Sequence, residues 1–149
     1  MKKFSVILIG FIYIASIVVI SVFGLRAESY TIVVPVTKIE CTNETDSNTE
    51  VSINNAGKKV IKVKYGEPGN PETLSGTMIQ LTYKVYPDDA TNKDVKFVYN
   101  KNNTNAVFHT TEDGKETGLI FFKGKCYMEI TITATDGSNC STTIIVWAY

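Results

Sequence analysis

The chain has 149 residues, and its 15 lysine and arginine residues are balanced by 15 aspartate and glutamate residues. This length allows one compact domain behind a short N-terminal segment and leaves no room for a second hydrophobic core. Nucleic-acid binding needs a clustered basic surface, which this balanced composition does not supply, so we expect no nucleic-acid partner.

An apolar segment without any charged residue runs over residues 4–25. Its 22 residues could cross a hydrocarbon layer of ~30 Å as a helix, and Lys2 and Lys3 before it favour a cytoplasmic N-terminus. We predict that residues 1–27 form a signal peptide or transmembrane anchor. The length of the run favours an anchor, which places the protein in the cell membrane as a single-pass protein with an extracellular C-terminal domain; secretion after signal cleavage is the alternative.

Residues 28–35 are predicted to form an extended tether, and residues 36–149 to form the exported domain. The polar stretches 42–50 and 66–76 are rich in Asn, Thr, Gly or Pro and are predicted to be surface loops. Alternating apolar and polar residues predict half-buried strands elsewhere, at residues 36–41, 60–65, 77–86, 95–100, 106–110, 119–124, 125–135 and 140–149. The sequence therefore predicts an all-β, antiparallel β-sandwich with roughly seven to nine strands.

The last predicted hairpin determines which aromatic residues face solvent. With a three-residue loop, Ile144 and Val146 point into the core and Trp147 points outward, whereas a shift of one residue exchanges the two faces. We favour the first register, which leaves an apolar strip near the C-terminus. The candidate partner-contact residues are Tyr127, Ile145, Trp147 and Tyr149.

The three cysteines, Cys41, Cys126 and Cys140, include no close pair of the kind that zinc or redox sites use. Alternation places all three on the inward faces of their predicted strands. Export would permit a disulfide, but the sequence does not choose between one bridge and buried free thiols.

The sequence offers no convincing catalytic or metal site. The single histidine, His109, has no second histidine to form a metal pair, and its strand lacks a nucleophile-elbow motif. The spacing of Asp88, Asp89 and Asp94 does not match an EF-hand loop, so solvated turn residues are favoured over a calcium site. We expect no enzymatic activity, no catalytic residues, no metal site and no cofactor.

Residues 73–149 resemble the bacterial Ig-like group 2 domain found in intimin- and invasin-type surface proteins. The segment TLSGTMIQLTYKVYPDDATNKDVKF matches a glycine, a strand ending before a proline, an Ala-Thr-Asn turn and the next strand of that family. The later motifs ITITATDGS and IIV follow in the same order, and VTKIEC at residues 36–41 resembles the first strand. Phe97 stands where the family usually has tryptophan.

The resemblance implies an Ig-like fold and a non-catalytic cell-surface domain that serves adhesion or ligand display. The N-terminal helix would provide the contact with the membrane, and the ligand would be an unidentified protein or glycan. One alternative is a structural or assembly accessory subunit of an envelope or phage complex. Another is a small carbohydrate-binding module, since Tyr127, Trp147 and Tyr149 could supply exposed rings.

Overall fold

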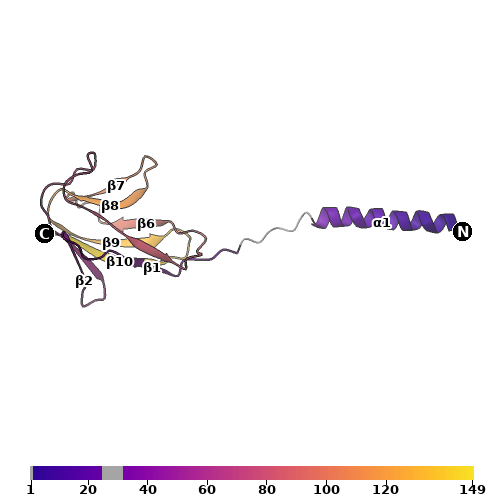
Figure 1. The fold of residues 1–149 in the computed structure, drawn as a ribbon, viewed down its shortest axis with the longest axis horizontal. Coiled ribbons are helices and arrows are strands. Elements are labelled where there is room, and N and C mark those ends of the chain that lie inside the picture. The colour runs from indigo at the N-terminus through magenta and orange to yellow at the C-terminus, as the bar shows by residue number, and fades with distance from the viewer. Residues whose placement is uncertain (1, 25–31) are drawn as a thin grey trace. The chain divides into compact units, whose positions relative to one another are not determined.

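The computed structural model describes residues 2–24 and 32–149. The chain divides into two units, of which the first ends at Ile32 and the second is Val33–Tyr149. The first unit contains helix α1 (Lys2–Gly24) (Figure 1). Among the described residues, no helix meets the length and hydropathy of a membrane span. Residues 25–27 of the predicted leader and residues 28–31 of the predicted tether lie outside the described residues.

The second unit is described without a gap and consists of strands joined by turns and loops. Its strands are β1 (Lys38–Cys41), β2 (Thr49–Ile53), β3 (Lys59–Val63), β4 (Met78–Gln80), β5 (Tyr83–Tyr86), β6 (Val95–Tyr99), β7 (Ala106–Thr110), β8 (Glu116–Phe122), β9 (Cys126–Ala134) and β10 (Ser141–Ala148). They form a five-stranded sheet in the order β2-β3-β10-β9-β6, a three-stranded sheet in the order β4-β8-β7, and the pair β1-β5. The sheets have a sandwich-like arrangement, with β7 and β8 on one side and β6, β9 and β10 on the other (Figure 1). The prediction of a mostly β domain is confirmed at this level.

The core is built by side chains that alternate along the strands. In β9, Ile130 and Ile132 are completely buried, while Tyr127 and Glu129 point to solvent. Ile120 and Phe122 of β8 belong to the same buried cluster, which joins the two larger sheets. This two-residue period is the pattern from which the strands were predicted.

The structure corrects three expectations about the strands. Residues 42–50 are not entirely a loop, because β2 begins at Thr49 and pairs with β3 through the turn at Asn54. The sandwich is not purely antiparallel, since β10 pairs in parallel with β3. The predicted strand at 77–86 is two strands, β4 and β5, which pair with β8 and β1 respectively. The last two corrections concern pairing between distant segments, which alternation within one segment does not encode, whereas the first concerns a local hairpin.

Candidate functional site

The most exposed large aromatic side chains of the β unit gather on the outer face of the five-stranded sheet. The register pairs Trp147 of β10 with Lys62 of β3 on one side and with Tyr127 of β9 on the other. The relative exposures are 62% for Tyr127, 41% for Trp147 and 45% for Tyr149. We call these three residues the aromatic patch. The expected burial of Ile144 and Val146 and the exposure of Trp147 are confirmed.

Backbone hydrogen bonds hold the C-terminal side of the patch in place. The Tyr149 N–H donates to the carbonyl of Val63 at 3.1 Å, and the Tyr65 N–H donates to the carbonyl of Tyr149 at 2.9 Å. The parallel ladder of β3 and β10 therefore continues past the end of β10. The ring centres of Trp147 and Tyr149 lie 5.8 Å apart with an interplanar angle of 53°, so the two rings form a tilted surface and not a single flat one.

An ion pair borders the aromatic patch. The Lys62 ammonium lies 5.9 Å from the centre of the Trp147 ring and 3.4 Å from Oε2 of Glu50. A lysine at this position attracts the ring face through a cation–π interaction, although exposure to water keeps the contribution small. The patch thus combines apolar rings with a nearby hydrogen-bond donor and acceptor. Lys62 and Glu50 were not predicted as contacts, since β2 was not predicted and the pairing of β3 with β10 is non-local.

Ile145 is not part of the exposed surface, which corrects the prediction of an apolar strip containing it. Only 5% of this residue is exposed. It does lie on the outer face, because its register partners Val60 and Glu129 have side chains on that face. Lys58 and Glu129 form an ion pair that reaches across β10, and we infer that the stems of these long side chains cover the isoleucine.

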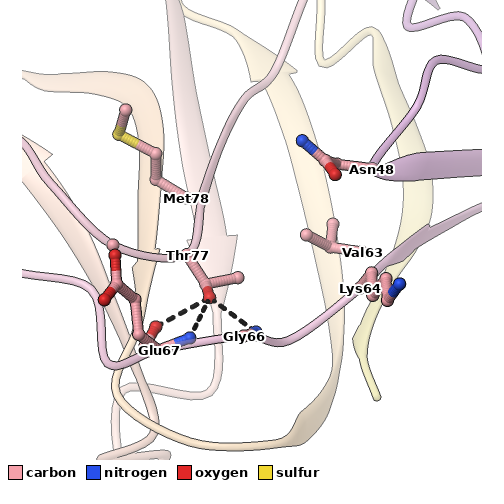
Figure 2. Close-up of a pocket in the computed structure, with 8 residues that line it drawn as sticks. Asn48, Val63, Lys64, Gly66, Glu67, Thr77 and Met78 are labelled. Atoms are coloured by element: carbon pink, nitrogen blue, oxygen red, sulfur yellow. Dashed lines mark hydrogen bonds between the residues drawn. The ribbon is translucent and has the colours of Figure 1, made fainter.

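A small cavity of about 240 Å³ lies beside the loop 66–77 and is lined in part by Asn48, Lys64 and Met78 (Figure 2). Thr77 fixes this loop: its Oγ1 accepts hydrogen bonds from the N–H groups of Gly66 and Glu67 and donates to the Glu67 carbonyl at 2.7 Å. These bonds satisfy the buried hydroxyl within the loop itself. The wall of the cavity is therefore a loop held by its own hydrogen bonds, and it brings no nucleophile and base together.

The histidine and the aspartates for which the sequence favours structural roles have local partners. His109 Nδ1 lies 3.3 Å from Oγ1 of Thr117, which in turn donates to the His109 carbonyl. Asp88 pairs with Lys84 at 3.3 Å and Asp94 pairs with Lys115 at 2.7 Å. In the part of the chain that the structure describes, no group of three or more His, Cys, Asp or Glu residues is placed to hold a metal ion.

The three cysteines are unbridged in the structure. Cys41 is buried, as alternation predicted, but Cys126 and Cys140 are only half-buried. Burial raises the pKa of the Cys41 and Cys126 thiols. A raised pKa keeps these groups protonated and therefore poor nucleophiles.

Neither the protein-family models nor the curated proteins compared with this chain gave a match.

Proposed function

We propose that this chain is a non-catalytic, exported domain of the bacterial Ig-like kind that displays the aromatic patch to a protein or glycan ligand. The observation that carries this proposal is the grouping of Tyr127, Trp147 and Tyr149 on one sheet face, each at least 41% exposed. Tryptophan and tyrosine supply most of the binding energy in many interfaces, since they bury a large area at small entropic cost.

The position of the patch on the sheet favours tight contact. Trp147 has a paired strand on each side, and Tyr149 is fixed by bonds to Val63 and Tyr65. A surface that is already ordered before binding loses less entropy on association than a mobile loop does. Lys62 and Glu50 add a donor and an acceptor at the border of the rings, which suits either polar protein groups or sugar hydroxyls.

The strand order supports the Ig-like part of the proposal. An Ig sandwich of the constant type has strands A, B, E and D in one sheet and C, F and G in the other. Assigning β4 and β5 to one interrupted strand B gives β1, β4/β5, β8 and β7 for A, B, E and D. Strands β6, β9 and β10 then correspond to C, F and G. In this assignment, the hairpin β2-β3 is an addition alongside strand G.

Export is the second part of the proposal, and the uncharged run of residues 4–25 behind Lys2 and Lys3 supports it. Fractionation of producing cells, with mass measurement of the protein from membrane and medium, tests it. An intact mass in the membrane fraction identifies an anchor, and a shortened mass in the medium identifies a cleaved signal. Recovery of the protein only from the cell interior would reject export.

Binding is tested by coupling the full-length chain to beads and probing it with arrays of surface glycans and of purified envelope and extracellular proteins. Trp147→Ala removes the central ring of the patch. Val98→Ala is the matched control, because Val98 is 52% exposed on the outer face of β6, two strands away. We expect binding that Trp147→Ala abolishes and Val98→Ala preserves.

The same experiment separates the rival functions. A signal only on glycans identifies a carbohydrate-binding module, and a signal only on an envelope protein identifies an assembly part. If neither array gives a signal that depends on Trp147, the patch is not a ligand site.

A further inference from the structure

The outer edge of β4 has unpaired backbone groups, whereas the other edge strands of the two larger sheets, β2, β6 and β7, are protected. The edge of β2 is occupied, since the Asp46 N–H donates to the Thr49 carbonyl and the Val51 N–H to Oγ1 of Thr45. Strand β6 carries Lys96, and β7 contains a bulge next to Phe108. Lysines and bulges are the usual devices that prevent a further strand from pairing. β4 (Met78–Gln80) has neither device.

Hydrogen-bond direction shows which backbone groups of β4 are open. The backbones of Thr77 and Leu81 bond to β8 at 2.9 Å. Because bonding direction alternates along an antiparallel strand, Met78 and Gln80 direct their backbone groups to the opposite side. In the described part of the chain, the N–H and C=O of Met78 and the N–H of Gln80 have no partner on that side.

A side chain of the same molecule already binds this edge as a peptide group would. Nδ2 of Asn43 donates to the Gln80 carbonyl at 2.8 Å, and its Oδ1 accepts from the Thr82 N–H at 2.9 Å. One amide thus supplies the donor and acceptor that a neighbouring strand would supply. The edge is therefore accessible to a peptide unit and correctly aligned for one next to Met78.

A cavity of about 500 Å³ opens beside this edge and has acidic character. Its lining includes the carboxylates of Glu44 and Asp46 and no lysine, arginine or histidine. Neither carboxylate has a salt-bridge partner among the residues that the structure describes. The site thus offers backbone partners on one wall and uncompensated negative charge on another.

We propose that this groove receives an extended peptide segment carrying a lysine or arginine, which pairs with the open edge of β4. Backbone bonds to Met78 and Gln80 provide the alignment, and Glu44 and Asp46 select the basic side chain. The site is separate from the aromatic patch and does not depend on the function proposed for it. With few open backbone groups, the charge selection contributes much of the affinity, which falls as salt increases.

The test measures binding of two synthetic extended peptides to the full-length chain by titration and by amide exchange. The peptides share a threonine- and valine-rich sequence and differ in having two lysines or two glutamates. The double variant Glu44→Gln/Asp46→Asn removes the groove charges and keeps the oxygen of residue 46 that accepts from the Asn48 N–H. Glu112→Gln/Asp113→Asn makes the same charge change in the turn between β7 and β8 and is the matched control.

We expect the lysine peptide to bind at least about tenfold more tightly than the glutamate peptide, and to slow amide exchange at Met78 and Gln80. The groove variant should lose this preference, whereas the turn variant and Trp147→Ala should keep it. Equal binding of both peptides, no binding, or protection at β6 or β7 in place of β4 would overturn the proposal. Loss of binding in Trp147→Ala would assign the peptide to the aromatic patch and would overturn it as well.

Discussion

Lys58 and Glu129 form an ion pair that crosses β10 on the outer face of the five-stranded sheet, the face on which Ile145 is only 5% exposed. The exposed aromatic patch therefore begins at Trp147 and does not extend further back along β10. On this face of β10, Ile145 is therefore a buried residue that stabilises the sheet, and Trp147 is an exposed residue that a ligand can reach.

Ile145→Ala should destabilise the domain even though Ile145 lies on an outer face. We expect a loss of about 2–4 kcal/mol in the free energy of unfolding, since the residue is buried and the substitution leaves a cavity. Ile53→Ala is the control, because Ile53 is 73% exposed. Urea unfolding of the full-length variants measures both, and equal effects would show that Ile145 is not buried.

Gly76→Ala should be much more damaging than Gly57→Ala. Both glycines have positive φ, at 81° and 76°, so each substitution brings a strain of about 1–2 kcal/mol. At Gly76 an added Cβ would also lie 2.2 Å from the Pro68 carbonyl oxygen, whereas Gly57 has nothing within 4 Å. Denaturant midpoints of the two variants test the difference. Similar midpoints would mean that the backbone of loop 66–77 shifts at little cost to accept the added Cβ.

Thr77→Val should loosen loop 66–77 while keeping the shape of the side chain. The substitution leaves two N–H groups and one carbonyl without their hydroxyl partner, at a cost of about 1–3 kcal/mol. Thr77→Ser retains the hydroxyl and is the control. Unfolding free energies and amide exchange at Gly66 and Glu67 check this prediction, which fails if valine and serine behave alike.

Asp136 should make stability depend on pH in the acid range. Hydrogen bonds from the Ser138 side chain, from the Val36 N–H at 2.6 Å and from the Ser138 N–H lower the pKa of Asp136 below its ordinary value of 3.8. A lowered folded-state pKa contributes stability above the unfolded value, and this contribution is lost as pH falls through the folded value. Asp136→Asn should flatten the stability profile below pH 3.8. An unchanged profile would show that these bonds do not favour the charged form.

Tyr99 should titrate late at alkaline pH. Burial, followed by its hydrogen bond to Glu116 at 2.9 Å, raises the pKa of Tyr99 to about 12. A raised pKa means that the contribution to stability is complete below the unfolded value of 10.0 and is lost as pH rises toward 12. Ultraviolet titration of tyrosinate absorbance, with Tyr99→Phe to assign the step, measures it. The assignment would be contradicted if Tyr99→Phe removed a titration step near pH 10.0 in place of the late step.

Local alternation predicted most strands, because a buried face repeats every second residue. Ile130 and Ile132 in β9 and Trp147 in β10 behave as that rule requires. The rule failed for β2, whose polar sequence becomes a strand only by pairing with β3. The two strands form a local hairpin around the turn at residues 54–58, and the polar run from 42 to 50, which favours a loop, hides the start of β2.

The candidate site was predicted in part for the same reason. Tyr127, Trp147 and Tyr149 are exposed on one face, but Ile145 on the same face is buried, and the nearby ion pair joins Glu129 of β9 to Lys58 just before β3. Lys62 and Glu50 at the patch, and Asn43 on the open edge of β4, are brought there by the tertiary fold. Their positions follow from register and loop closure, which side-chain periodicity does not specify.

Trp147 is the single tryptophan of the chain, so its fluorescence reports directly on the proposed ligand surface. The most direct test is acrylamide quenching of the full-length chain, alone and with each glycan or protein that scores on the arrays. We expect strong quenching of the free chain and marked protection when a ligand covers the patch. Quenching that stays the same in the presence of a bound ligand would contradict binding at the aromatic patch, because the ligand would then lie elsewhere.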